Sequence, residues 1–341
     1  MTRHPLLLAI SVVDTLSAAL LLYAAWFAVR TLTAWAPDSH DSVQLRLERR
    51  IETAEIAARF GFGFFALASV LLVVGISQVL PPIVPGAMCG TGVIQSSQGL
   101  LNKAIWFRAL GLLTVYLWAV LAKLDRRQPD SPLVCVNARV LLLAAALVAA
   151  AAVITAQASM AIDLQQPVDC CTVVYDTLRR GAADVFVSGT WMTGAYGVMS
   201  LGLLACSLWV IATGASQRFL AAAALCAALA AWLPLAAFAL VDSFAAYYYE
   251  VLQHRCPWCL FLPEHGRVGY LLFAALLAAA LEGPVALLSA KVGISHPQFS
   301  SEVRRRCRTA AVRVLVANVV FFCLAVFPAI LWRLRYGVWM G

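Results

Sequence analysis

The chain has 341 residues, of which 62% are hydrophobic and 12% charged, with a mean hydropathy of +0.85 and a net charge of +8. A soluble globular domain is about 45–50% apolar and about 25% charged, so the composition excludes an ordinary soluble protein. Nucleic-acid-binding proteins are also basic, but they carry basic stripes with interleaved aromatic residues that this sequence lacks. The composition therefore predicts an integral membrane protein with no nucleic acid among its partners.

Apolar segments long enough to cross a bilayer recur along the whole chain. A membrane-spanning helix needs about 20 largely apolar residues, and this rule predicts about eight spans. The first, Leu6–Arg30, is predicted to be a retained helix, because its apolar run exceeds the about 7–15 residues of a signal peptide. The others are predicted, in chain order, at Phe60–Leu80, Ala104–Lys123, Arg139–Ile162, Thr190–Thr213, Arg218–Val241, Val268–Leu288 and Ala310–Leu331. The expected fold class is all-α, a polytopic helical bundle that forms a single transmembrane domain over residues 1–341.

An amphipathic segment precedes the second span. The stretch "SHDSVQLRLERRIETAEIAARF" has Leu47, Ile51 and Ala54 at helical spacing, and Asp41 is a candidate cap at its start. We expect a helix over residues 41–59 that lies on the inner membrane surface and continues into the second span.

The basic residues of the connecting loops are divided unequally between the two sides of the predicted bundle. The clusters "RLERR", "KLDRR" and "RRRCR" fall on one side, together with most of the 25 Lys and Arg residues. Cytoplasmic loops carry the excess of basic residues, so this side is predicted to be cytoplasmic and both termini to lie on the outer side. The expected location is the plasma membrane, a bacterial inner membrane, with the other loops facing the periplasm or exterior.

Half of the ten cysteines fall in three loops on the predicted outer side, at residues 81–103, 163–189 and 242–267. These cysteines are Cys89 in the first loop, Cys170 and Cys171 in the second, and Cys256 and Cys259 in the third. Disulfides persist on this face of a membrane, and the charge asymmetry does not depend on the cysteines. The remaining cysteines lie in spans or near the cytoplasmic surface, where a cysteine is usually a small buried hydrophobic residue. The outer loops are therefore the candidate functional site.

The stretch "HRCPWCLFLPEH", residues 254–265, contains a C-x-x-C motif with several candidate chemistries. Covalent haem attachment requires a histidine directly after the second cysteine, and that position is Leu260. Haem between the helices would need histidines within the spans, and none of the five lies mid-span. Structural zinc needs four ligands, whereas a soft ion such as Cu(I) prefers thiolate and thioether ligands. Met88 beside Cys89 fits such a soft site, so metal binding stays open, although the sequence assigns no ligand set.

Thiol–disulfide exchange is the chemistry that the motif favours most. The thiols of Cys256 and Cys259 are close enough to form a small ring, and such motifs can lower the pKa of one thiol. His254 and Arg255 are the nearest charge partners of Cys256 in the sequence. Cys256 is therefore the candidate attacking thiolate and Cys259 the resolving thiol.

A second cysteine pair lies in "VDCCTVVYD". Cys170 and Cys171 can bridge each other only through a strained ring, and strained disulfides are labile; alternatively, one of the two pairs with Cys89. A C-x-x-C at the outer membrane edge with a second pair in an outer loop resembles the arrangement in quinone-linked disulfide-generating membrane proteins, which are small four-helix bundles. The resemblance covers this arrangement alone, and it implies a quinone as the candidate cofactor.

The sequence thus predicts a membrane thiol–disulfide oxidoreductase whose catalytic candidates are Cys256, Cys259, Cys170, Cys171 and Cys89. Its partners would be the lipid bilayer and an outer-face protein or larger membrane complex. Two alternatives remain open. One is a membrane subunit of a transport or respiratory assembly whose outer loops are held by structural disulfides. The other is a soft-metal protein that binds or transfers copper or zinc.

Aromatic and charged residues near the outer membrane edge provide a candidate quinone site. Tyr249 precedes the C-x-x-C, Trp258 lies within it, and Arg108 falls near the outer end of the third span. A quinone ring bound among these residues is one interpretation, and an aromatic belt at the headgroup level is the other. Asp14 and Glu282 lie inside predicted spans, where charges are costly. A buried polar contact that fixes helix packing is the favoured interpretation of these acids, and a proton or quinone pathway is the alternative.

The predicted sidedness is tested by reporter fusions at Asp130 and Gly341. Alkaline phosphatase is active only outside the cytoplasm, so it should be active when fused at Gly341 and inactive when fused at Asp130. A green fluorescent reporter should give the reverse pattern. The same signal from both positions would contradict the model of both termini outside.

Overall fold

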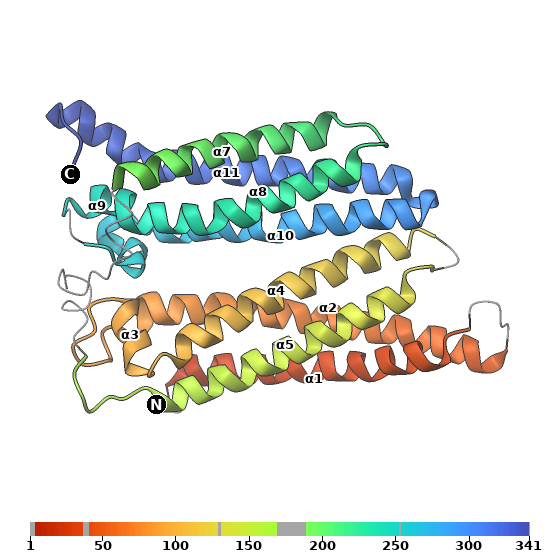
Figure 1. Ribbon diagram of the computed structural model, residues 1–341. Coiled ribbons are helices and arrows are strands. Elements are labelled where there is room, and N and C mark those ends of the chain that lie inside the picture. Colours follow the sequence, from red (N-terminus) through yellow and green to blue (C-terminus); the bar gives the residue numbers. More distant parts are fainter. Residues whose placement is uncertain (1–3, 37–40, 129–130, 169–188, 252–253, 341) are drawn as a thin grey trace. The chain divides into compact units, whose positions relative to one another are not determined.

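The structure is a computed structural model that describes residues 4–36, 41–128, 131–168, 189–251 and 254–340. Within these ranges all regular structure is helical, and no strand occurs (Figure 1). The first half contains α1 (Pro5–Ala34), α2 (Ser42–Val74), the π-helical segment η1 (Gly75–Val79), α3 (Gly90–Ser96), α4 (Leu100–Asp125) and α5 (Val134–Ala161). The second half contains α7 (Gly189–Ala212), α8 (Arg218–Ala239), the π-helical segment η4 (Leu240–Phe244), α9 (Ala245–Tyr249), the short 3₁₀ helices η5 (Pro257–Phe261) and η6 (Pro263–His265), α10 (Val268–Ser295), η7 (Pro297–Phe299) and α11 (Ser300–Tyr336).

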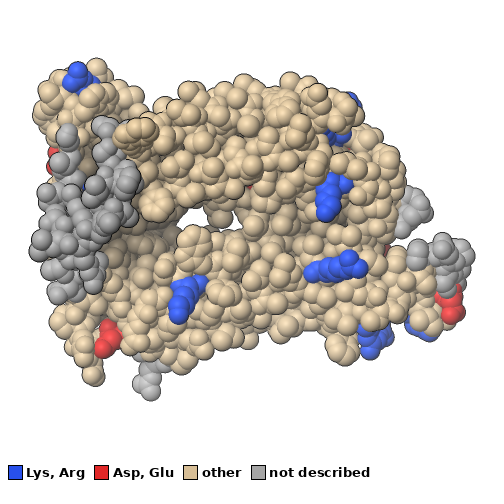
Figure 2. Space-filling model, in the orientation of Figure 1, with Lys and Arg blue, Asp and Glu red and all other residues tan. Residues whose placement is uncertain are grey.

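The structure confirms the prediction of an all-α membrane protein. Among the described residues, eight helical stretches are long and apolar enough to cross a bilayer. They extend beyond the predicted apolar runs, because a helix continues for as long as its backbone bonds are satisfied and does not stop where polar side chains begin. Figure 2 accordingly shows few charged side chains on the visible surface over the middle of the helices.

Helix α2 joins the predicted amphipathic segment to the second span. It begins at Ser42, directly after Asp41, whose carboxylate accepts a hydrogen bond from the Ser42 backbone N–H. The helix then runs without a break to Val74, so residues 42–59 form its N-terminal half. The buried positions of this half include Leu47 and Ala54, two of the three apolar residues from which the helix was predicted.

The contacts between residues divide the chain into two compact units, and the first unit contains residues 1–87 and 92–168. Its four long helices form two hairpins, α1 with α2 and α4 with α5, and the hairpins meet where α1 packs on α5 and α2 on α4 (Figure 1). Helices α1 and α2 approach closely at Gly61, whose carbonyl accepts a hydrogen bond of 2.8 Å from the Ser17 hydroxyl. A side chain at Gly61 would lie 2.9 Å from Leu21, so a small residue is required there.

A buried ion pair lies at the centre of this first unit. The guanidinium of Arg108 on α4 bonds to the carboxylate of Asp14 on α1. It also donates to the hydroxyls of Thr155 on α5, at 3.1 Å, and Ser69 on α2, at 3.3 Å. All four long helices therefore contribute to one polar contact. This finding supports the interpretation of Asp14 as a packing residue, with Arg108 as the partner that the sequence did not identify.

The second unit contains residues 88–91 and 169–341. Its hairpins are α7 with α8 and α10 with α11, and they meet where α8 packs on α10 and α7 on α11. Glu282 on α10 is buried and accepts hydrogen bonds from two arginines of α11, Arg306 at 2.8 Å and Arg313 at 2.6 Å. The acid predicted inside the seventh span is thus held between two cationic groups of the next helix.

The two units share one plan. In each, the second long helix runs into a π-helical segment, η1 or η4. A cysteine-bearing loop follows η1 directly and follows η4 after the short helix α9. Each of these loops ends at a glycine with positive φ, Gly99 or Gly266, close to the start of the third long helix. The same spacing separates Cys89 from Gly99 and Cys256 from Gly266. Cys89 and Cys256 therefore occupy equivalent positions in the two plans.

Breaking the Asp14–Arg108 pair should destabilise the protein strongly. Replacing Asp14 by Leu leaves an unpaired buried guanidinium, and loss of one partner of such a pair costs about 3–5 kcal/mol. The thermal unfolding midpoint of the detergent-solubilised protein should therefore fall markedly for Asp14→Leu. The additional substitution Arg108→Leu should restore much of this loss, because no charge then remains unpaired.

Arg126→Ala is the matched control for this experiment. Arg126 pairs with Glu55 at 2.8 Å, but its side chain is 45% exposed, and exposed pairs contribute about 0–1 kcal/mol. If Asp14→Leu lowered the midpoint no more than Arg126→Ala does, the central role of the buried pair would be wrong.

Candidate functional site

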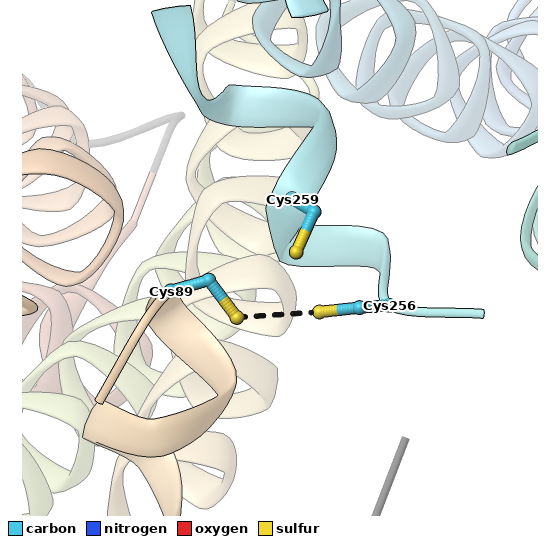
Figure 3. A group of neighbouring side chains, drawn as sticks. All are labelled: Cys89, Cys256 and Cys259. Carbon is cyan, nitrogen blue, oxygen red and sulfur yellow. Dashed lines mark hydrogen bonds between the residues drawn. The ribbon is translucent and has the colours of Figure 1, made fainter. Parts of the chain in front are cut away.

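Three of the predicted cysteines meet in the second unit. The sulfur atoms of Cys89, Cys256 and Cys259 all lie within 4.8 Å of one another, and we call them the three-cysteine group. The sulfurs of Cys89 and Cys256 are 3.4 Å apart. Figure 3 shows Cys89 reaching in from the start of α3 toward Cys256 and Cys259 on η5. No disulfide joins these three cysteines to one another.

The local sequence explains how Cys256 and Cys259 come to face the same side. Cys256 caps η5 and Pro257 is its first residue, where the fixed φ of proline suits a helix start. Side chains three positions apart eclipse each other in a 3₁₀ helix, which places Cys259 over Cys256. Pro263 then begins η6, and Gly266, with φ of 64°, ends it before α10 begins.

The three-cysteine group is almost completely buried. The exposed fractions are 2% for Cys89, 1% for Cys256 and 8% for Cys259. Tyr249, Trp258 and Leu262 pack against the thiols. The group is therefore shielded from water by aromatic and apolar side chains.

Tyr249 connects the group to two histidines. Its hydroxyl donates a hydrogen bond to the backbone carbonyl of Cys256. Its ring packs edge-on against His254 and His265, with centroid distances of 4.5 and 4.7 Å. Burial, together with the neighbouring His265, lowers the pKa of His254.

Hydrogen bonds make the Cys256 sulfur the preferred site for the thiolate. Those from the Cys259 and Cys89 thiols are the largest causes that lower the pKa of Cys256, and they outweigh the opposing effect of burial. The Thr91 hydroxyl, 2.9 Å from the Cys256 sulfur, acts in the same direction. The pKa of Cys259 is raised in turn, because its thiol keeps its proton to donate to Cys256 and because it is buried.

Hydrogen bonds, and not the two sequence neighbours of Cys256, are the causes that lower its pKa. Arg255 was expected to favour the Cys256 thiolate, but its guanidinium pairs with Asp242 at 2.9 Å. His254 was expected to help through its charge, but burial lowers its pKa and so disfavours the cationic form. Arg255 instead ties the loop to η4.

The remaining predicted residues fall elsewhere. Cys170 and Cys171 lie outside the described residues. Arg108 belongs to the first unit, where Asp14 holds its guanidinium, while Tyr249 and Trp258 belong to the second unit with the thiols. The other described cysteines are also free; they are Cys135, Cys206, Cys226, Cys307 and Cys323.

Thr91 is a member of the site that was not predicted from the sequence. The signal was present in the spacing, because "CGTGVIQSSQG" and "CPWCLFLPEHG" both place a glycine at the same distance from their first cysteine. Aligning the two stretches would have paired Cys89 with Cys256. It would also have drawn attention to Thr91, two residues after Cys89.

Comparison with protein-family models, with curated proteins and with solved structures found no match to this chain.

The order of thiol acidities is tested by the pH dependence of alkylation. The thiolate fraction of an ordinary thiol, with a pKa of about 8.5, falls tenfold for each pH unit below that value. Because the pKa of Cys256 is lowered, its rate of reaction with a small uncharged reagent should change little between pH 8 and pH 6. The rate at Cys259 should fall about tenfold per unit over the same range. Peptide mapping by mass spectrometry after quenching measures both rates in one sample.

Thr91→Val is the matched variant, since it removes one hydrogen-bond donor and preserves the side-chain shape. It should shift the alkylation profile of Cys256 toward that of an ordinary thiol. A wild-type profile for Cys256 as steep as that for Cys259 would contradict the proposed acidity.

Proposed function

We propose that this chain is a membrane thiol–disulfide oxidoreductase whose central reacting sulfur is that of Cys256. The observation that carries the proposal is the distance of 3.4 Å between the sulfurs of Cys89 and Cys256, with Cys259 in the same group. Reacting atoms about 3–3.5 Å apart are in a near-attack arrangement, whereas a disulfide bond is about 2.05 Å long. Cys256 is therefore within reach of two alternative disulfide partners.

The internal step moves the disulfide without a net change in oxidation. Starting from a Cys256–Cys259 disulfide, the Cys89 thiolate attacks the Cys256 sulfur. A Cys89–Cys256 bond forms, and Cys259 leaves as a thiolate that takes up a proton. The two states differ only in which cysteine is bonded to Cys256. In each direction, the sulfur outside the disulfide, that of Cys89 or Cys259, attacks Cys256 and the previous partner leaves.

Exchange with an external partner transfers two electrons. A thiolate of a client dithiol at the outer face attacks the Cys256 sulfur of the Cys256–Cys259 disulfide, and Cys259 leaves. The second client thiolate then attacks the mixed disulfide and releases Cys256. The client becomes a disulfide, and the C-x-x-C becomes two thiols that receive the client's two protons. The lowered pKa of Cys256 suits this cycle, because a thiol of lower pKa leaves faster.

The Cys170–Cys171 pair is the proposed next member of the relay. The backbone N–H of Val168, two residues before Cys170, donates a hydrogen bond of 3.0 Å to the carbonyl of Pro85, a residue of the loop that continues to Cys89. A Cβ on Gly86 would lie 2.5 Å from the Val168 carbonyl oxygen, so the two backbones are in close contact. Val168, which lies two residues before Cys170, is thus in contact with the loop that carries Cys89.

A quinone is the proposed membrane oxidant. Two thiols and a quinone yield a disulfide and a quinol, which balances two electrons and two protons. Trp258 and Tyr249 support this part of the proposal, because both pack against the three-cysteine group and aromatic rings of this kind favour the membrane interface. Arg108 is left out of the proposed ring site, since its guanidinium is already bound to Asp14.

Trapping of a mixed disulfide tests the proposal. Substituting Cys259 alone is insufficient, because Cys89 is also close enough to resolve an adduct on Cys256. The double variant Cys89→Ala/Cys259→Ala should therefore accumulate a covalent adduct between Cys256 and its client, visible as a reductant-sensitive band in acid-quenched membranes. Cys259→Ala alone should give less of it.

Cys323→Ala is the control, because this cysteine lies on α11 and should neither form nor prevent the adduct. Addition of Cys256→Ala to the double variant should abolish the adduct. If no adduct forms, and the triple variant disrupts assembly of a membrane complex, then the alternative of a subunit with structural disulfides is the better account.

A further inference from the structure

We propose that the reduced three-cysteine group binds one thiophilic metal ion, Cu(I), through its three sulfurs. This inference goes beyond disulfide exchange and rests on the positions of the sulfurs alone. It would hold whether or not an external client exists.

The spacing of the sulfurs fits a three-coordinate ion. Metal–thiolate bonds of about 2.3 Å place three sulfurs about 4.0 Å apart around one ion. The sulfurs of Cys89 and Cys256 are 3.4 Å apart, and all three lie within 4.8 Å of one another. Small rotations of these side chains would bring all three distances to the required value.

The donor set selects a soft ion of low coordination number. Thiolates select Cu(I) and zinc over hard cations, but structural zinc takes four ligands. Among the residues that the structure describes, the group contains three sulfurs and no imidazole or carboxylate ligand. Since the thiols are also buried, water has little access to a fourth position. Cu(I), which is satisfied by three sulfurs, fits this site better than zinc.

Neighbouring side chains hold the three cysteines in position, as the residues around the ligands do in metal sites. The Thr91 hydroxyl lies 2.9 Å from the Cys256 sulfur, and the Tyr249 hydroxyl fixes the Cys256 backbone. Partners of this kind orient metal ligands and tune the affinity of the site. Trp258 and Leu262 cover the group with apolar surface.

Copper binding and disulfide formation exclude each other at this group. Cu(I) replaces the protons of the thiols and keeps its oxidation state, so binding releases protons and transfers no electrons. A sulfur within a disulfide has no thiolate to offer. An ion bound to all three sulfurs would therefore block the internal exchange, and oxidation of any pair would expel the ion.

The test uses reduced full-length protein in detergent without oxygen, titrated into the coloured complex of Cu(I) with bicinchoninate. Wild-type protein should withdraw one equivalent of Cu(I), and X-ray absorption should show three sulfur neighbours around the copper. Cys89→Ser, Cys256→Ser and Cys259→Ser should each weaken binding by at least about tenfold, the smallest loss seen when even an outer partner of a metal ligand is removed. Thermal unfolding of each variant without copper shows whether it is folded.

Cys323→Ser and Cys206→Ser are the controls, because these cysteines lie on α11 and α7 and outside the three-cysteine group, and both should bind as the wild type does. Failure of the wild type to compete for Cu(I), or a copper shell with fewer than three sulfurs, would overturn the proposal. Loss of binding in either control would overturn it as well. Because client trapping is measured without copper, failure of the metal site and failure of the exchange reaction are distinguishable.

Discussion

The bilayer interior offers no hydrogen bonds to the peptide backbone, and the architecture of this protein follows from that constraint. Every crossing segment must satisfy its own N–H and C=O groups, so each described span is a helix. Irregular backbone is thereby confined to the helix ends. The three-cysteine group is built there, from a loop before α3 and from the short helix η5. The constraint that produces the fold thus also determines where chemistry can be placed.

The same constraint explains how the buried charges are arranged. An unpaired charge within a bilayer is costly, and Asp14 and Glu282 each meet at least one arginine of their own unit. Asp14 bonds to Arg108, and Glu282 bonds to Arg306 and Arg313. These contacts tie helices together where apolar packing alone would be weakly specific, since lipid tails are as apolar as leucine. The ion pairs thus favour a packing role for both intramembrane acids.

The geometry of the three thiols fits both of the proposed chemistries. Sulfurs at near-attack distance can exchange a disulfide, and sulfurs at this spacing can also surround a soft ion. Both uses require thiolate, and burial alone would suppress it. At Cys256, hydrogen bonds from the neighbouring thiols and from Thr91 offset the effect of burial on the pKa. The redox state of the group would then decide which chemistry is open, because a disulfide removes the ligands that a metal needs.

The sequence by itself determined what depends on residues close together in the chain. Apolar length predicted the eight spans, helical spacing with Asp41 predicted the start of α2, and the C-x-x-C predicted that Cys256 and Cys259 would meet. Only the tertiary structure decided the partners that come from distant segments. Cys89 is 167 residues from Cys256, and Asp14 is 94 residues from Arg108. Arg255 adjoins Cys256 in sequence yet pairs with Asp242 on η4. The physical reason is that helix propensity and hydropathy act along the chain, whereas ion pairs and thiol contacts depend on which helix ends the packing of the bundle brings together.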